Sequence, residues 1–287
     1  MNSGNQSLKA APRNHSTTPE RRSFFGKLAA LMALFIPIKA AQAAVDSSTG
    51  KADPVESLQK QLADMSYQLG MVQDTLAIRN LQHAYGYYLD KCLYLEVVDL
   101  FADDSRVIFN GGIYLGKAGV KRLYVDLFQN TFTNGKNGPL PGFLLDHPQM
   151  QDVVHISPDR KIAKGRFRTL MQAGVHETSK APMAENARKE GRPLNQWWEG
   201  GMYENTYVRE KGIWKIKELS YRPFWHADYE TGWAHTRVPY VPPFSETYPD
   251  NPTGPDELDK NYAGLWPNTD VVPFHYPHPV TGAVWKG

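Results

Sequence analysis

The sequence predicts an α+β fold, a cone-shaped roll in which a curved antiparallel sheet wraps around helices, with an N-terminal helix and an irregular C-terminal arm. Three features predict this fold. Helical patterns come first in the mature chain, a short β-hairpin and another helix follow, and long strand-like runs separated by turns come last. We expect such a roll to enclose one deep apolar pocket.

Residues 1–43 have the features of a twin-arginine export signal. Arg21 and Arg22 precede a short apolar run from Leu28 to Ile38, and small residues at 41–43 provide a cleavage site. The run is too short to span a bilayer as a helix, which needs about 20 residues. The alternative is a basic tail beside a buried helix. The signal predicts a periplasmic protein whose mature chain begins at Ala44.

The basic residues of the chain are concentrated in this signal. Residues 1–43 contain six Lys or Arg and one Glu, so 26 bases and 29 acids remain in the mature chain. No basic cluster is left to follow a phosphate backbone, which argues against a nucleic-acid partner. Cys92 is the only cysteine, which excludes an internal disulfide and a cysteine-based zinc cage.

Residues 44–73 are expected to form a linker and an N-terminal helix. Pro54 suits the first turn of this helix. Apolar residues then recur at spacings of three and four, which places them on one narrow stripe: Val55, Leu58, Leu62, Met65, Leu69 and Val72. This stripe could pack on the main domain or on another subunit, and it favours a homodimer or homotrimer.

Residues 74–230 form the predicted main domain. Asp74 can cap a second helix from Thr75 to about Lys91, and the run YLEVVDLFADD predicts a third. A hairpin at 106–116, a helix at 117–130 and a polar loop at 133–142 follow. Four strand candidates come next: QMQDVVHIS, KIAKGRFRTLMQAGV, QWWEGGMYENTYVRE and IWKIKELSYRPFW. A charged insertion at 176–195 interrupts them.

Residues 231–287 form the predicted arm. From Pro239 onward there are ten prolines and eight Phe, Trp or Tyr in 49 residues. Dense proline forbids regular structure, whereas the aromatic residues argue against simple disorder. We expect an irregular segment packed on the body or on a neighbouring subunit. Its His275 and His278 are spaced like metal ligands, but we predict no metal site.

The segments IRNLQHAYGYYLDKCLYLEVVDLFADDSRVIFNGGIYLGKAGV and YENTYVREKGIWKIKELSYRPFW resemble the SnoaL-like branch of the nuclear transport factor 2 (NTF2-like) superfamily. The resemblance covers about residues 74–230. It implies the same cone-shaped roll. The related types are scytalone dehydratase, bile acid 7α-dehydratase and lignin diarylpropane γ-formaldehyde lyase. Because the superfamily includes enzymes and binders, it implies no single function.

The helix around residue 85 has two faces. At 100° per residue, Tyr85 and Tyr88 share an aliphatic and aromatic face, whereas Tyr87 and Asp90 lie on the other, with His83 and Tyr94. The second face is rich in tyrosine for a solvated surface, which indicates that it borders a cavity. The alternative is an ordinary surface carboxylate at Asp90.

The resemblance implies the catalytic candidates. The related dehydratases place a carboxylate near the end of this helix to orient a catalytic histidine, and the bile acid enzymes have a Tyr-x4-Asp spacing that Tyr85 and Asp90 match. The histidine follows the loop after the central helix, which implies His147 ahead of His155. The bile acid enzymes also have a pocket arginine late on the last strand, which implies Arg222.

Strand alternation places Arg222 on the same face of the last strand as Trp214 and Ile216, which also favours a position in the pocket. Further substrate-binding candidates are aromatic or lie at the strand ends: Tyr87, Tyr88, Trp198, Tyr203, Trp225 and His226. Trp197 adds aromatic surface. Sheet packing is the alternative role for these aromatic residues.

A histidine held by a buried carboxylate can accept a proton near neutral pH, and an arginine or tyrosine can stabilise the resulting oxyanion. This chemistry predicts a cofactor-independent lyase that removes water or formaldehyde from a bulky hydroxylated aromatic, lignin-derived or polycyclic compound. No dinucleotide or phosphate-loop motif is present. The alternatives are a periplasmic binder of a hydrophobic ligand, a ketosteroid-type isomerase and an oxygenase small subunit.

Overall fold

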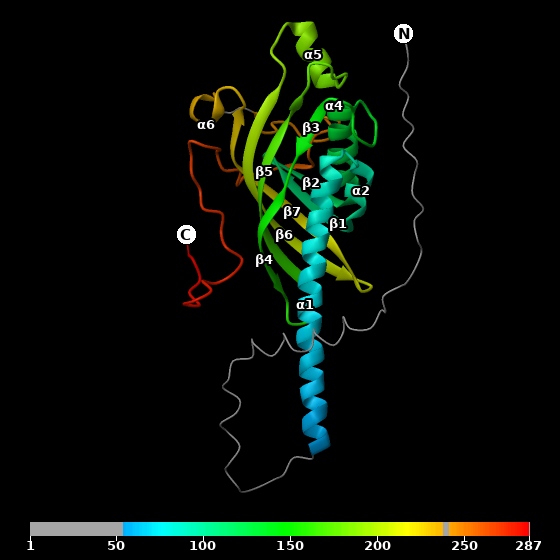
Figure 1. Ribbon diagram of the computed structural model, residues 1–287, viewed down its shortest axis with the longest axis vertical. Helices are drawn as coiled ribbons and strands as arrows, with labels where there is room; N and C mark the ends of the chain where they lie inside the picture. Colours follow the sequence, from blue (N-terminus) through cyan, green and yellow to red (C-terminus); the bar gives the residue numbers. More distant parts are fainter. Residues whose placement is uncertain (1–53, 238–240, 287) are drawn as a thin grey trace, which may run out of the picture. The chain divides into compact units, whose positions relative to one another are not determined.

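The computed structural model describes residues 54–237 and 241–286. The predicted export signal and the linker at 44–53 lie outside the described residues. Within the described part the fold is α+β, as predicted, with one open sheet and helices packed against it (Figure 1). The helical segments are α1 (Pro54–Asp90), α2 (Tyr94–Asp99), α3 (Gly116–Lys121), η2 (Arg122–Gln129), α4 (Asn130–Thr133), α5 (Pro182–Glu190) and α6 (Gly232–His235).

The sheet has eight strands among the described residues: β1 (Phe101–Phe109), β2 (Gly112–Leu115), β3 (Phe143–Asp146), β4 (Gln149–Ile156), β5 (Ile162–Val175), β6 (Gln196–Glu210), β7 (Ile213–Asp228) and β8 (Glu257–Leu258). Their order is β3-β5-β6-β7-β1-β2-β8, and β4 also pairs with β5. The β1–β7 pair is parallel and the others are antiparallel. The four long strand candidates of the sequence are therefore confirmed as β4 to β7.

Helix α1 is continuous through Asp74, so the prediction that Asp74 caps a second helix is wrong. The Asp74 side chain is buried, and its carboxylate accepts hydrogen bonds from Arg160 Nε at 2.5 Å and Trp214 Nε1 at 3.0 Å. Arg209 also lies 3.3 Å from it. Tertiary partners therefore hold this aspartate inside the helix. Although α1 is 37 residues long, no helix of the described residues combines the length and hydropathy needed to cross a membrane.

About two helical turns after Asp74, Gln82 joins the same face of α1 to the sheet. Its side-chain oxygen accepts hydrogen bonds from Asn205 at 2.9 Å and Tyr207 at 2.8 Å, and its amide donates to Gln149 at 2.7 Å. Gln82 is fully buried. Because each buried polar atom finds a partner, the network fixes α1 against β6 at little desolvation cost.

The segment after α1 differs from the sequence prediction in one place. The predicted third helix ends at Asp99, and Phe101 begins β1. Phe101 is fully buried and pairs in parallel with Ile216 of β7, so sheet pairing overrides the helical pattern of this segment. The predicted hairpin is confirmed as β1–β2, with positive φ at Asn110 (46°) and Gly111 (79°).

Strand β7 contains two irregularities of register against β6. Thr206 and Tyr207 are consecutive on β6, but they pair with Glu218 and Ile216, so Lys217 is an extra residue. In the same way, Gly200 and Gly201 face positions 225 and 223, so position 224 is extra. Each bulge reverses which side chains face inward. Leu219 and Tyr221 therefore continue the inner face begun by Trp214 and Ile216.

The C-terminal arm packs on its own domain. Asp256 forms an ion pair with Arg122 at 2.5 Å, and β8 adds a short strand beside β2. Further along, the carbonyl oxygen of Phe224 accepts a hydrogen bond from the backbone N–H of Trp266 at 2.8 Å. His275 meets Glu204 and lies 3.1 Å from His155, while the His278 ring accepts hydrogen bonds from its own turn.

The Asp74 cluster generates a stability prediction. Replacing Asp74 with Ala leaves two arginines and the Trp214 N–H without their acceptor, so we expect the free energy of unfolding to fall by about 3 kcal/mol. Urea unfolding followed by circular dichroism measures this. Asp64→Ala, on the exposed side of the same helix, is the control and should change the value by less than about 0.5 kcal/mol. Equal stability of the two variants would contradict a structural role for Asp74.

Candidate active site

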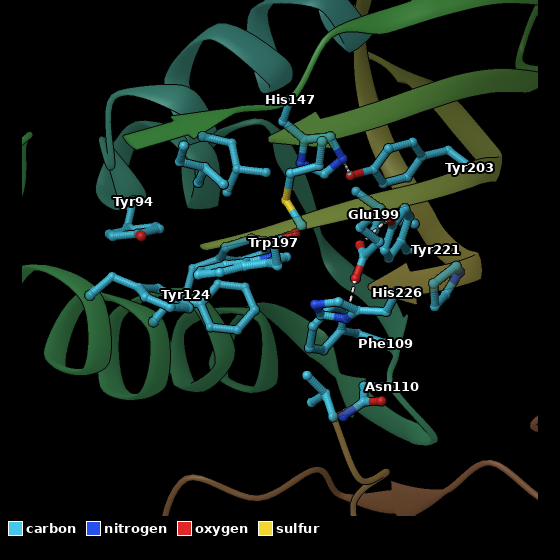
Figure 2. Close-up of a pocket in the computed structure, with 18 of the residues that line it drawn as sticks. Tyr94, Phe109, Asn110, Tyr124, His147, Trp197, Glu199, Tyr203, Tyr221 and His226 are labelled. Atoms are coloured by element: carbon cyan, nitrogen blue, oxygen red, sulfur yellow. Dashed lines mark hydrogen bonds and ion pairs between the residues drawn. The ribbon is translucent and has the colours of Figure 1, made fainter. Parts of the chain in front are cut away.

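An apolar cavity of about 260 Å³ lies between the inner face of the sheet and the helical segments α1, α2, η2 and α4 (Figure 2). Val241 and Leu265 of the arm contribute to its wall. Most of the lining side chains are aromatic or aliphatic. They include Tyr85, Leu89, Tyr94, Phe109, Tyr124, Phe128, Phe132, Phe143, Leu145, Met171, Met183, Trp197, Tyr203, Leu219 and Tyr221. The polar groups that could react are therefore few and can be considered one by one.

A carboxylate and an imidazole form a pair inside this cavity. Glu199 of β6 and His226 of β7 are directly paired residues on neighbouring antiparallel strands. Glu199 Oε2 lies 2.9 Å from His226 Nδ1, and the Tyr221 hydroxyl donates a hydrogen bond to the other carboxylate oxygen (Figure 2). Both side chains of the pair are more than nine-tenths buried. The register of β6 and β7 thus builds a Glu–His pair on the inner face.

The Glu199 carboxylate is stabilised as an anion despite its burial. Burial alone raises the pKa of a carboxyl group, but the hydrogen bonds from His226 and Tyr221 and the attraction to the His226 imidazole outweigh it. The net result is a Glu199 pKa below its ordinary value. An ionised Glu199 favours the His226 tautomer with a proton on Nδ1, which makes Nε2 the basic nitrogen.

A second histidine, His147, lies in the same cavity, where burial controls its charge. Its Nε2 is 3.2 Å from the Tyr203 hydroxyl. Burial lowers the pKa of the His147 ring to about 4, and the Glu199 charge opposes this only in part. The ring is therefore neutral near pH 7. If Tyr203 donates to Nε2, the other ring nitrogen, Nδ1, carries the proton.

Tyrosine rings surround these groups. The hydroxyls of Tyr85 and Tyr124 are 3.0 Å apart, and the Tyr85 ring packs edge-on against Tyr203 with centroids 5.7 Å apart. Burial raises the pKa of Tyr85 to about 12, so it stays protonated and acts only as a neutral hydrogen-bonding group near pH 7.

The buried polar atoms of the cavity that have no hydrogen-bond partner among the described residues include His147 Nδ1 and Trp197 Nε1. A buried polar atom without a partner costs about 1–3 kcal/mol, which a ligand with a hydrogen-bond acceptor would relieve. Figure 2 shows both side chains among the sticks that border the cavity.

The cavity is poor in charge. Of its described lining residues, Glu199 is the only Asp, Glu, Lys or Arg. Over residues 54–237 and 241–286, no three His, Cys, Asp or Glu side chains are grouped so that they could hold a metal ion. The arrangement suits proton transfer on an uncharged molecule.

Asp90 does not meet the His147 ring, which differs from the sequence prediction. Its carboxylate accepts a hydrogen bond from the main-chain N–H of His147 at 2.8 Å. Burial, with the nearby Asp146 charge, raises the pKa of Asp90 to about 6 against the effect of this bond. Asp90 ends α1 and so fixes the link between β3 and β4, whereas the ring of His147 lines the cavity. Asp90 therefore positions His147 through its backbone.

Arg222 lies outside the cavity because of the first of two bulges in β7, and Trp225 lies outside it as well. Strict alternation from Trp214 would turn Arg222 inward, but the extra residue at 217 turns it outward, where it donates to the Asn261 carbonyl of the arm at 3.0 Å. The second bulge reverses the pattern again. It brings His226 inside and leaves Trp225 to pack against Trp233.

The remaining candidates divide in the same way. Tyr85, Tyr203 and His226 line the cavity. Tyr87 is 74% exposed, which places it away from the cavity. Tyr88 packs against the hydrophobic core but does not line the cavity. Trp198 stacks on Tyr229 on the other face of the sheet. His155, the weaker of the two histidine candidates, contacts the arm.

The sequence interpretation missed Glu199 and Tyr221. A signal for Glu199 was present, because a lone carboxylate stands in the run WWEGGMY, among aromatic residues and glycines that are typical of an inner face. It shares the odd-numbered phase of Tyr203 along β6. Tyr221 had no such signal, because its inward direction depends on the bulge at Lys217.

The family model of the SnoaL-like domain matches residues 70–220 of the chain. Solved structures that resemble the chain include a putative scytalone dehydratase from Novosphingobium aromaticivorans DSM 12444, with 19% identity, a TM-score of 0.43, and coverage of 64% of this chain and 99% of that one. Another is a type 3 hexachlorocyclohexane dehydrochlorinase from Novosphingobium barchaimii LL02, with 15% identity, a TM-score of 0.43, and coverage of 62% and 99%.

No curated protein matches the chain at a significant level. The matched segment contains α1 from Gly70, most of the sheet, His147 and Glu199, whereas His226 and the arm follow it. It spans more than half of the 287 residues. The resemblance noted in the sequence is thereby confirmed, and the chain belongs to the SnoaL-like domain family.

Proposed function

We propose that this protein is a small-molecule lyase that eliminates water or formaldehyde from an uncharged hydroxylated aromatic compound. The observation that carries the proposal is the Glu199–His226 pair inside the aromatic cavity. A carboxylate-held imidazole in an apolar enclosure is a general base, and it replaces the Asp90–His147 pair expected from the sequence.

The Glu199–His226 pair accepts the proton. His226 Nε2 removes a proton from a substrate C–H or O–H bond, and the imidazolium that forms is stabilised by the adjacent Glu199 carboxylate. Tyr221 keeps that carboxylate in place through its hydrogen bond. Because the cavity is apolar, the ion pair formed in this step is only weakly screened.

The His147–Tyr203 pair assists the oxygen on the opposite side of the reaction. A neutral His147 with its proton on Nδ1 can donate a hydrogen bond to a carbonyl or leaving hydroxyl oxygen, and Tyr203 bonded to Nε2 favours that tautomer. The two imidazoles are therefore suited to different roles, since one is paired with an anion and the other is kept neutral by burial.

In a dehydration, His226 takes the C–H proton, the electron pair forms a C=C bond, and the neighbouring C–O bond breaks. The departing hydroxide takes the proton from the His226 imidazolium or by way of His147, and water leaves. In loss of formaldehyde, His226 takes the proton of a hydroxymethyl group instead. The C–C bond then breaks as the C=O bond of formaldehyde forms, its electron pair passes into an adjacent carbonyl group of the substrate to give an enolate, and the enolate takes the proton back from the His226 imidazolium, so that formaldehyde alone leaves.

The cavity lining indicates the substrate class. Rings of Phe109, Phe128, Phe132 and Phe143 offer faces and edges for stacking on aromatic groups. No cationic side chain among the described lining residues is available to pair with a substrate carboxylate or phosphate. Trp197 Nε1 and His147 Nδ1 are donors for substrate oxygens. These features support an uncharged, oxygenated aryl compound, such as a lignin-derived one.

A mass-resolved turnover assay tests this function. The full chain is incubated without added cofactor with uncharged hydroxylated diarylpropanes, aryl β-hydroxy ketones and hydroxysteroids. We expect a product lighter by water or by formaldehyde, and Glu199→Gln should lower kcat/KM by about 100-fold or more because the imidazolium loses its counter-charge. Glu218→Gln, the same change on the outer face of the sheet, should retain activity.

Two results would count against the lyase. If compounds bind in the cavity but are recovered unchanged, the protein is a binder. If a product of unchanged mass forms, it is an isomerase. Full activity of Glu199→Gln would remove Glu199 from the mechanism, whatever the product.

The neutral state of His147 generates a pH prediction. The ordinary histidine pKa of about 6.5 applies to the unfolded chain, whereas the folded pKa is about 4. Well above pH 6.5 the ring is unprotonated in both states and has no effect on how stability changes with pH. As pH falls from 6.5 to 4, the unfolded chain binds a proton that the folded protein does not, so stability is lost, by up to about 3 kcal/mol at pH 4.

Urea unfolding at several pH values from 7.5 to 4.5 measures this loss. The stability of His147→Gln should decline less steeply than that of the unmodified protein over this range. His235→Gln, at an exposed histidine, is the control and should follow the unmodified protein. Parallel curves for His147→Gln and the unmodified protein would contradict a neutral buried His147.

A further inference from the structure

Helix α1 carries a stripe of exposed apolar side chains that its own domain does not cover. We name it the α1 seam, and it consists of Leu58, Leu62, Met65, Leu69, Val72 and Leu76. Each of these side chains is between 50% and 68% exposed. From Leu58 to Leu69 every residue of the helix is exposed. Apolar side chains repeated in this way on a bare helix indicate an interaction surface.

The domain packs on the opposite face of α1. The Tyr67 hydroxyl donates to the Pro158 carbonyl at 2.9 Å, and Gly70, Asp74 and Ile78 are buried. At 100° per residue these four positions lie roughly 120–200° from the centre of the seam. The contacts that hold α1 on the sheet therefore do not bury the α1 seam.

The spacing of the seam is that of a coiled coil. Its residues are spaced alternately four and three positions apart, as the a and d positions of a heptad are. The pattern ends where the next d position is Arg79, which forms an ion pair with Asp152 of the domain at 3.1 Å. A surface helix that packs on a globular core has a wider apolar stripe.

The positions that flank the seam favour pairing with an identical helix. In a coiled coil the e and g residues face the partner and often carry charges that select it. Here all of them are uncharged: Gln59, Gln61, Ser66, Gln68, Gln73 and Thr75. Two copies can therefore approach without like charges opposing each other across the interface.

The surface available is also of the right size. Six leucine, methionine and valine side chains at these exposures offer on the order of 600 Å² of apolar area per helix, near the roughly 800 Å² per partner of a standard interface. An isolated helix exposed on all sides is marginal in water, so a partner would stabilise this part of α1.

From these observations we propose that the α1 seam forms a two-stranded coiled coil with the α1 seam of a second copy of this chain. The partner is identified by the unbroken a/d pattern and the neutral flanks, which suit self-pairing. Dimerisation by this route leaves the cavity of each copy unobstructed, since the seam and the cavity lie on different faces of α1.

Sedimentation velocity of the full chain tests the proposal. We expect a species of twice the 32.4 kDa chain mass at micromolar concentration. Leu62→Glu with Leu69→Glu places four charges in the seam of a dimer, and the dissociation constant should rise by at least about 100-fold, which gives a monomer. The circular dichroism spectrum should keep the sheet signal, which reports that the domain is folded.

The matched control places the same two charges off the seam. Ser57→Glu with Ala63→Glu changes exposed positions on the same helix and should remain dimeric. A dimer that survives the seam variant would overturn the proposal and assign association to another face. A monomeric unmodified chain would also overturn it.

Discussion

The two bulges of β7 determine which side chains the sheet presents to the cavity. Without them, β7 would present every second residue from Trp214 to its end. With Lys217 and Phe224 as extra residues, the inner face changes from even to odd numbers and back again. Leu219 and Tyr221 enter in the first change and His226 in the second. With one bulge alone His226 would face outward, and with neither the register would set Glu199 opposite Phe224, so the direct Glu199–His226 pairing depends on both bulges.

The opposite side of the cavity depends on how firmly α1 is held. Asp74 and Gln82 are polar residues on the face of a helix that a simple amphipathic pattern would fill with leucine. Their cost is offset by complete pairing: Asp74 by two arginines and Trp214, Gln82 by Asn205, Tyr207 and Gln149. Directional bonds fix the rotation of α1 about its axis. This rotation turns Tyr85 toward Tyr124 and leaves the α1 seam outside.

The architecture was largely predictable from the sequence, because hydrophobic periodicity and turn residues report backbone structure directly. The long strands, the β1–β2 hairpin and the central helix follow from such patterns. The role of Asp74 was not predictable, since a capping aspartate and a buried aspartate in mid-helix look the same until the partner arginines, more than 80 residues away, are known. Likewise, Phe101 lies in a helical sequence pattern but pairs with a strand more than 100 residues later.

The site was predictable only where it did not depend on strand phase. His147 and Tyr85 were found because a resemblance and a helical face identify them. Arg222 was assigned to the cavity by counting alternate residues, and one bulge is enough to reverse such a count. The bulge at Lys217, which turns Arg222 outward, has no glycine or proline beside it in the sequence, whereas Pro223 stands beside the bulge at Phe224. Glu199 could have been found, since β6 keeps a regular alternation between positions 197 and 207.

Strand β6 also supplies the glutamate of a second Glu–His pair, whose surroundings differ from those of the pair proposed for catalysis. On the outer face Glu204 bonds His275 of the arm, but Arg166 also binds this carboxylate at 2.5 Å and His155 lies 3.1 Å from the other nitrogen of His275. Both ring nitrogens are thus engaged by the protein, and the carboxylate is neutralised by an arginine. That pair fastens the arm.

On the inner face no arginine or lysine of the described lining offsets Glu199. Its charge is held by His226 and by the Tyr221 hydroxyl alone, so it remains available to stabilise a developing imidazolium. The two Glu–His pairs are therefore suited to different purposes because of their surroundings. The arginine beside Glu204 suits a structural contact, whereas the apolar, tyrosine-lined enclosure around Glu199 suits the proposed base.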